Sequence, residues 1–334
     1  MLLEFNVENY LSFKNRVVFS MMASSISEHE ESNVFTYQNK TRLLRSAAIY
    51  GANGSGKSNL LKAMRFMRSF VLDSSRESQV DEQIPVDSFR LSTSTIDAPS
   101  LFEILFIHNN IRYRYGFQVD RQEVIAEWLF YTPEVKERKL FTRDKRNFSL
   151  GTGFKEGKEL TEFTRDNALY ISVVAQFNGK ISKQVLEWFR NLTIVSGLSD
   201  SHIDHTTLRL EQPLMKPALL SFIKTFDLGF DDISVHTGSK SIDGDWARNL
   251  AHTIISTFKG KRLYTAHKKY NENLEPVEDV EEFSLTENES DGTQKIVALS
   301  STILEALLSG HTLVIDELDA RLHPILTQHI IRLL

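Results

Sequence analysis

Residues Tyr50-Gly51-Ala52-Asn53-Gly54-Ser55-Gly56-Lys57-Ser58-Asn59-Leu60 match the pattern G-x-x-x-x-G-K-[S/T]. The glycines let the backbone turn tightly, so that successive N–H groups point at a polyphosphate at the positive end of the following helix. Lys57 adds a point charge for the β- and γ-phosphates, and the Ser58 hydroxyl is placed to bind Mg²⁺. The residues from Asn53 to Asn59 therefore predict an ATP site with a magnesium ion.

The residues on either side support this interpretation. Ala47-Ala48-Ile49-Tyr50 is an apolar run of strand length, and residues 59–72 carry apolar side chains at helical spacing. Those apolar positions are Leu60, Leu61, Met64, Met67, Phe70 and Val71. A strand, a glycine-rich turn and a helix are the context that a phosphate-binding loop requires, so a chance match is the weaker explanation.

Composition places the chain among ordinary globular proteins. It has 334 residues, of which 41% are hydrophobic and 25% charged, and it contains no cysteine. Disulfides and thiolate metal sites are thereby excluded. The sequence shows neither a long apolar run nor a secretory signal, so a cytoplasmic protein without a membrane partner is expected. The net charge of -5 argues against a uniformly basic nucleic-acid binder.

The N-terminal part predicts a β-hairpin. Apolar and polar residues alternate from Leu2 to Tyr10, and a second strand is expected over Val17–Ser20. Residues 22–40 are polar and are expected to form a loop, and residues 73–83 a linker.

An antiparallel sheet is expected between residues 86 and 150. Residues 101–107, 111–117 and 124–131 have the pattern of strands, and Asn109-Asn110 supplies the chemistry of a two-residue turn. Six of the eleven residues from Lys136 to Arg146 are basic. A solvated hairpin edge is the preferred explanation of that charge, and a nucleic-acid backbone contact is the alternative.

Helical spacing returns at residues 182–192 and 214–226, with a polar loop expected over 196–207. An acidic stretch over 275–289 is expected to be exposed. Three residues of the polar loop can bind metals but lack a partner motif, so no metal site is expected there. They are His202, Asp204 and His205.

A second informative region lies near residue 316. Thr312-Leu313-Val314-Ile315-Asp316-Glu317 is an apolar strand that ends in two carboxylates. Such an arrangement puts Asp316 beside the Mg²⁺ ion and Glu317 where it can polarise an attacking water. Upstream, Ser290-Asp291-Gly292-Thr293-Gln294 precedes an apolar helix over 296–308, and a small-residue turn at a helix start is an anion-binding device.

The order of these motifs carries a family resemblance. A large insertion separates Lys57 from Asp316, and the Ser-x-Gly turn comes shortly before the acidic strand. That order resembles the ABC-type ATPase heads of the SMC, RecF and OLD proteins. It is most similar to the AAA-labelled ATP-binding proteins of bacterial abortive-infection and anti-phage systems. The resemblance rests on Glu4–Phe13, Gly51–Leu61, Glu289–Gln294 and Ile315–Pro324.

The resemblance implies an α/β fold. An ABC-type P-loop NTPase head combines an N-terminal antiparallel hairpin sheet with a parallel core sheet, here with a large mixed α+β insertion. Residues 1–80 would form the N-terminal lobe with the P-loop. Residues 81–280 would form the inserted β-meander and helical arm, and residues 281–334 the lobe with the signature and acidic motifs.

The resemblance also implies roles for individual residues. Ser290 and Gly292 would contact the γ-phosphate bound to a second copy, so two heads would sandwich ATP in a homodimer or a higher oligomer. Glu317 would be the catalytic base, assisted by Lys57, and Asp316 would hold Mg²⁺ together with Ser58. A further residue, His323, would lie in the loop that reports across the dimer interface.

Three features depart from the family pattern. Leu11 precedes Ser12-Phe13 where related proteins often have Arg or Lys, and Gln83 is a weak candidate for the glutamine loop. Leu334 lies within the helix that starts near His323-Pro324. The core sheet is therefore expected to be truncated and to lack the switch histidine, so this chain alone is expected to bind ATP but hydrolyse it poorly.

The leading functional hypothesis is an ATP-driven dimeric switch in phage defence. It would control a separately encoded effector, expected to be a nuclease, in response to a phage protein or DNA. One alternative is a RecF-type chromosome-maintenance ATPase that loads on DNA, which salt-dependent DNA affinity would favour. Another is a non-hydrolysing scaffold that uses ATP only to assemble, which normal behaviour of a Glu317→Gln variant would favour.

Overall fold

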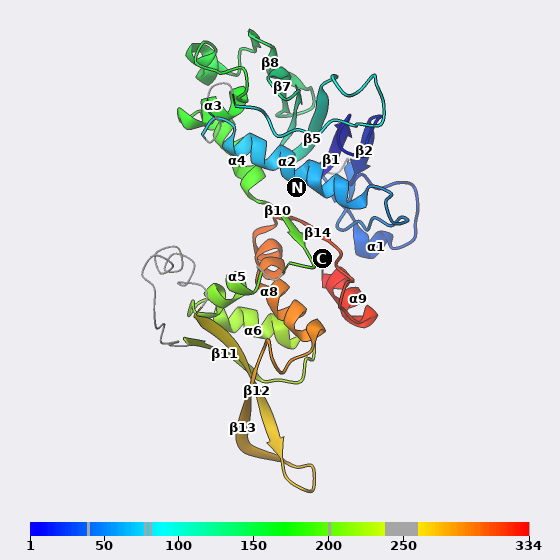
Figure 1. The fold of residues 1–334 in the computed structure, drawn as a ribbon, viewed down its shortest axis with the longest axis vertical. Coiled ribbons are helices and arrows are strands. Elements are labelled where there is room, and N and C mark those ends of the chain that lie inside the picture. The colour runs from blue at the N-terminus through cyan, green and yellow to red at the C-terminus, as the bar shows by residue number, and fades with distance from the viewer. Residues whose placement is uncertain (39–40, 77–78, 80–81, 200–201, 238–259, 334) are drawn as a thin grey trace. The chain divides into compact units, whose positions relative to one another are not determined.

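The structure, a computed structural model, describes residues 1–38, 41–76, 79, 82–199, 202–237 and 260–333 (Figure 1). The chain divides into two compact units. Unit 1 contains Met1–Ile194 and His311–Val314, and unit 2 contains Val195–Gly310 and Ile315–Leu334. Each unit combines helices with an antiparallel sheet, so the mixed α/β class expected from the sequence is confirmed.

Unit 1 is built on a seven-stranded sheet with the order β2-β1-β5-β6-β7-β8-β9. Neighbouring strands pair antiparallel throughout. The predicted N-terminal hairpin and meander are both confirmed, and Asn109 and Asn110 turn the chain with φ of 49° and 61°. The strands are β1 (Leu2–Glu8), β2 (Val17–Ser20), β5 (Ser100–His108), β6 (Ile111–Val119), β7 (Val124–Thr132), β8 (Arg138–Asp144) and β9 (Asn147–Leu150).

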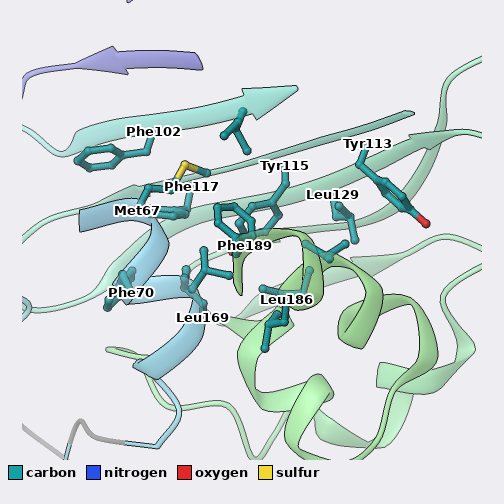
Figure 2. Packing of buried hydrophobic residues seen from close by; sticks show 14 of the residues in the cluster. Met67, Phe70, Phe102, Tyr113, Tyr115, Phe117, Leu129, Leu169, Leu186 and Phe189 are labelled. Carbon is teal, nitrogen blue, oxygen red and sulfur yellow. The ribbon is translucent and has the colours of Figure 1, made fainter. Parts of the chain in front are cut away.

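The helices of unit 1 pack on this sheet through aromatic and aliphatic side chains. Figure 2 shows Met67 and Phe70 of the first long helix lying with Phe102 and Phe117 of the sheet. The rings of Phe70 and Phe117 are 5.5 Å apart between centroids. The predicted helix over 59–72 is confirmed. Because this helix packs on the sheet, it fixes the loop that precedes it to the core. The helices are α2 (Lys57–Asp73), α3 (Tyr170–Gln176), α4 (Lys180–Arg190) and the 3₁₀ helix η1 (Lys155–Leu160).

One cation of the basic segment Lys136–Arg146 forms a buried ion pair with a residue of β7. Arg143 and Glu127 are 3% and 0% exposed, and their charged atoms lie 3.7 Å apart. Burial raises the pKa of Glu127, whose carboxylate also accepts the N–H groups of Tyr170 at 2.7 Å and Ile171 at 3.0 Å. Glu127 thus caps the start of α3. The Arg143 guanidinium is therefore part of the core and is inaccessible to a nucleic-acid backbone.

Two segments near the P-loop differ from the sequence prediction. Residues 22–40 are not a plain loop, because they contain α1 (Glu30–Asn33) and β3 (Val34–Tyr37), which pairs with β4 (Thr41–Leu44). Residues 47–50 do not form a strand. Ile49 and Tyr50 are 44% and 86% exposed, so this apolar run has no strand-like burial within unit 1.

Unit 2 packs α5 (His202–Leu210) and α6 (Lys216–Lys224) against α8 (Asp291–Ser309) and ends in α9 (Pro324–Leu333). A three-stranded antiparallel sheet has the order β11-β12-β13. Figure 1 shows β12 and β13 as a long hairpin. The strands are β11 (Asp232–Thr237), β12 (Lys261–Tyr270) and β13 (Pro276–Ser284). Two further strands, β10 (Leu192–Ser196) and β14 (Thr312–Asp316), pair with each other, and each has residues in both units.

The predicted loop over 196–207 is partly wrong, because residues from His202 onward form α5. Thr206 is fully buried and donates to the carbonyl of Ala298 at 2.9 Å, which joins α5 to α8. His205 contacts Ser301 at 2.9 Å and thus also serves packing. Among the described residues no group of three metal-binding side chains is present, and no helix is long and apolar enough to cross a membrane.

Candidate functional site

The P-loop has the backbone geometry that a phosphate cradle requires. Gly54 and Gly56 have φ of 76° and 97°, in the left-handed region that favours glycine. A Cβ on Gly56 would lie 2.9 Å from Ser12 Oγ and 3.2 Å from Phe13, so this position has neither the conformation nor the space for a side chain. The chain turns here directly into α2, whose first N–H groups have no acceptor within the helix.

Charge at this end of α2 suits an anion. The first turn of the helix, which the structure describes in full, contains no acidic residue. The Lys57 ammonium folds back over the loop and donates to the carbonyls of Gly51 at 2.6 Å and Ala52 at 2.9 Å. The Ser58 hydroxyl is exposed beside it. Backbone N–H groups, the helix dipole and a lysine therefore converge on one place that can receive an anion, with the Ser58 hydroxyl exposed beside it.

A pocket of about 580 Å³ lies next to the P-loop in unit 1. Asn59, from the first turn of α2, donates to Ser12 Oγ at 2.9 Å, and both residues line the pocket. The opposite wall comes from the loop after residue 86, where Arg90 and Asp87 form an ion pair at 2.9 Å. The remaining lining residues are Leu11, Ser88, Phe89 and Leu91.

Asn9 builds this wall. Its side chain is 3% exposed, donates to the carbonyls of Thr95 and Ala98, each at 2.8 Å, and accepts the N–H of Phe89 at 3.0 Å. The N–H of Leu11 donates to the carbonyl of Asp87 at 2.9 Å. The loop over residues 87–98 is thereby held against the turn between β1 and β2, which fixes the pocket beside the P-loop.

The two predicted carboxylates lie in unit 2 at the end of β14. Asp316 is the last residue of the strand, and Glu317 has φ of 51°, which is uncommon for a residue other than glycine. The carbonyl of Glu317 accepts the N–H of Ala320 at 3.2 Å, so the chain turns sharply after the strand. We call residues 317–323 the acidic loop. The backbone conformation of Glu317 is unfavourable for an L-residue, so contacts within the surrounding structure must stabilise it.

The predicted signature turn also lies in unit 2, where Ser290 caps α8. Its Oγ accepts the N–H of Thr293 at 3.1 Å, and Gln294 donates to the carbonyl of Glu289 at 2.9 Å. The Glu289 carboxylate accepts from His267 Nε2 at 2.7 Å, which ties the turn to β12. Ser290 itself is exposed, so the turn combines a fixed backbone with an accessible helix N-terminus.

The structure brings the signature turn and the acidic loop together within unit 2. A Cβ on Gly292 would lie 3.3 Å from the carbonyl of Arg321. Lys295, five residues after Ser290, donates to the carbonyls of Glu317 at 2.9 Å and Ala320 at 2.5 Å. Neither Lys295 nor Gly197, whose N–H donates to the carbonyl of Asp316, was singled out by the sequence motifs. The sequence signal for Lys295 was a charged residue directly before the apolar run Ile296–Leu299.

His323 has a structural contact in its own chain. Its Nδ1 accepts the N–H of Ile325 at 3.3 Å, and its carbonyl accepts the N–H of Leu326 at 2.9 Å, so His323 caps α9. Gln83, the candidate for the glutamine loop, is exposed. The interface role of His323 and the metal-sensing role of Gln83 stay predictions.

Comparison with known proteins gives one family match. The family model described as "AAA domain, putative AbiEii toxin, Type IV TA system" matches residues 46–218 and 225–334. These ranges contain the P-loop, the signature turn and the acidic loop. No curated protein matches the chain. Because the match covers most of the sequence, the chain belongs to this family of P-loop AAA ATPases tied to abortive infection.

Proposed function

We propose that the chain is an ATP-binding and ATP-hydrolysing switch that acts as a dimer. The observation that carries this proposal is the start of α2, where two left-handed glycines, Lys57 and a helix N-terminus without acidic residues surround one anion site. Such a site binds phosphates by backbone geometry, and the family is one of AAA ATPase domains.

The nucleoside end of ATP is assigned to the pocket beside the P-loop. A volume of about 580 Å³ suits a nucleoside. Asn59 belongs to the first turn of α2 and also lines the pocket. We therefore place the ribose and base of a ligand whose phosphates lie at Lys57 next to Ser12 and Asn59. Asp87 and Arg90 supply an acceptor and donors for a base edge, and Phe89 and Leu91 supply apolar surface.

Hydrolysis requires a base and a metal. We assign the base to Glu317 and the metal ligands to Asp316 and Ser58, on the strength of their motifs. Mg²⁺, when bound, neutralises charge on the β- and γ-phosphates. The left-handed backbone of Glu317 supports its assignment, because strained residues held by their surroundings cluster at functional sites.

The proposal of a dimer rests on the signature turn. Ser290 and Gly292 sit at an accessible helix N-terminus, which suits contact with the γ-phosphate of ATP bound to a second copy. We further propose that β14 belongs to the parallel core sheet that the family resemblance implies. The residues of β14 are only half-buried, which supports this because apolar strands of such sheets are normally covered.

The biological role that we propose is regulation within a bacterial anti-phage defence system. The family's tie to toxin–antitoxin and abortive-infection systems supports it. ATP binding would change the separation of two heads and so restrain or release a separately encoded effector nuclease. If a nuclease encoded nearby co-purifies with the wild-type chain but not with a Lys57→Ala variant, this role is supported; equal recovery with both would contradict nucleotide control.

Mixing two inactive variants tests the ATP sandwich. Lys57→Ala removes the P-loop lysine, and Gly292→Asp places a negative charge on the signature turn; each alone should lose turnover. A mixed dimer contains one site with both motifs intact, so each mixed dimer should regain about half of the wild-type turnover. A 1:1 mixture that pairs at random contains about half mixed dimers, so its turnover per dimer should be about a quarter of the wild-type value. Absence of any regain, while both variants remain folded, would show that one chain supplies the whole site.

DNA loading is disfavoured by the surroundings of the basic segment. Three of its six cations are engaged within the chain: Arg143 is buried, Lys145 pairs with Glu123 at 2.8 Å, and Arg146 pairs with Asp166 at 2.7 Å. The other three, Lys136, Arg138 and Lys139, are exposed. We therefore expect no ATP-stimulated DNA affinity. DNA binding that weakens steeply with salt and requires ATP would instead support a DNA-repair role.

A further inference from the structure

Lys295 is a buried cation inside unit 2. Its side chain is 6% exposed, although it lies on α8 only five residues after Ser290. Burial lowers its pKa, while the charges of Asp319 and Glu317 act in the opposite direction. A buried ammonium is costly unless it is hydrogen-bonded. Its ammonium donates to backbone carbonyls of the acidic loop, so this lysine stabilises one conformation of that loop.

The contacts of Lys295 converge on the residue proposed as the base. Its Nζ donates to the carbonyl of Glu317 at 2.9 Å and to that of Ala320 at 2.5 Å. The Glu317 carbonyl accepts the Ala320 N–H as well. With φ of 51°, Glu317 is in a conformation that costs roughly 1–2 kcal/mol for an L-residue, so it persists only where such bonds hold it.

We propose that Lys295 is the positioning residue that holds Glu317 in its active orientation and joins the signature turn to the acidic loop. The proposal rests on the function proposed above. In this proposal Lys295 touches neither ATP nor the attacking water, and it acts through the backbone of Glu317. Because Ser290 caps α8 and Lys295 lies on the same helix, one rigid helix links the turn that would contact ATP on a second copy to the base that acts on ATP of its own chain. Occupation of one site would thereby bias the geometry of the other.

The test replaces Lys295 by methionine, which keeps length and volume but removes the charge and the donors. Lys295→Met should lower kcat about 10- to 100-fold, because small displacements of a catalytic group cost that much, and should leave ATP affinity within about twofold. In a Glu317→Gln background the same change should lower kcat by less than about twofold, since both act through one group. Lys183→Met, on the exposed face of α4, is the matched control.

Amide hydrogen exchange tests whether Lys295 holds the acidic loop, and it does not require ATP turnover. Lys295→Met should speed amide exchange at least about tenfold in residues 317–322, whereas α8 and unit 1 keep wild-type protection. Unchanged exchange in the acidic loop would overturn the proposal. Equal losses of kcat in the wild-type and Glu317→Gln backgrounds, or a large loss of ATP affinity, would also overturn it. If wild-type turnover does not exceed that of Lys57→Ala, the proposed ATPase function fails, and the exchange result still decides whether Lys295 positions Glu317.

Discussion

The backbone N–H of Gly197 donates to the carbonyl of Asp316 at 2.7 Å, so residue 197 lies directly against the end of the acidic strand. A Cβ at this position would stand 2.5 Å from the carbonyl of Glu317 and 2.7 Å from Lys295 Nζ. Real Cβ atoms do not approach other atoms so closely. The acidic loop and its lysine therefore depend on the absence of a side chain at residue 197.

We expect Gly197→Ala to displace the acidic loop. Overpacking of this kind costs roughly 1–3 kcal/mol of stability, and the shift should lower ATP turnover more than tenfold because it moves Glu317. Gly310→Ala is the control: φ of 64° makes it strained by about 1 kcal/mol, yet an added Cβ meets nothing within 4 Å. Chemical denaturation and steady-state turnover measure the two effects. Wild-type turnover in Gly197→Ala would contradict the dependence of Glu317 on this contact.

If the pocket beside the P-loop binds the nucleoside, then different residues should determine nucleoside binding and phosphate binding. Arg90→Ala should weaken ATP binding about three- to tenfold and leave inorganic tripolyphosphate binding unchanged, because tripolyphosphate reaches only the P-loop. Lys57→Ala should weaken both ligands. Competition titrations against a fluorescent ATP analogue give the affinities. Arg121→Ala, in the turn between β6 and β7, is the control, since Arg121 pairs with Asp87 at 3.2 Å but does not line the pocket. Equal ATP affinity in the wild type and Arg90→Ala would remove Arg90 from the nucleoside site.

Stability of unit 1 should depend on its buried ion pair. Glu127→Ala leaves Arg143 buried without its carboxylate and removes the cap of α3, so the free energy of unfolding should fall by about 3–5 kcal/mol. Glu137→Ala breaks an exposed pair with Arg114 and should cost less than about 1 kcal/mol. Urea denaturation followed by far-UV circular dichroism compares the two variants. Similar costs for both would contradict the burial argument.

Alkaline stability should reflect a buried tyrosine. Burial raises the pKa of Tyr113 from 10.0 to about 12. Between these values the unfolded chain loses the phenolic proton while the folded chain keeps it, so this contribution is complete below pH 10 and is lost as pH rises towards 12. Tyr113→Phe should flatten that decline by about 1–2 kcal/mol, after allowance for solvent screening. Tyr50→Phe, at an exposed position, is the control. An identical decline in wild type and Tyr113→Phe would contradict the assignment.

Sequence periodicity predicted the elements that bury a regular apolar face. The hairpin of β1 and β2, the meander of β5–β7 and helices α2 and α8 were all predicted because their apolar residues recur every two or every three to four positions. The P-loop was predicted by its glycines, whose left-handed φ angles the structure shows at Gly54 and Gly56.

Elements held by polar contacts could not be predicted in the same way. Helix α5 is anchored by Thr206, whose hydroxyl bonds to a backbone carbonyl, so hydropathy patterns read its residues as a loop. Residues 47–50 show the opposite error, because an apolar run does not reveal whether a neighbouring strand is present to cover it. Lys295 is buried through two carbonyls that come from residues more than twenty positions away, which no local pattern shows.

The most direct test of the proposed switch is the mass of the Glu317→Gln variant in solution, measured by light scattering with and without ATP and Mg²⁺. A base-deficient ATPase should retain unhydrolysed ATP between two heads, so its mass should double when ATP is added and stay that of a monomer in a Lys57→Ala, Glu317→Gln double variant. A mass that ATP leaves unchanged, or that doubles equally without the P-loop lysine, would contradict an ATP sandwich between two copies of this chain.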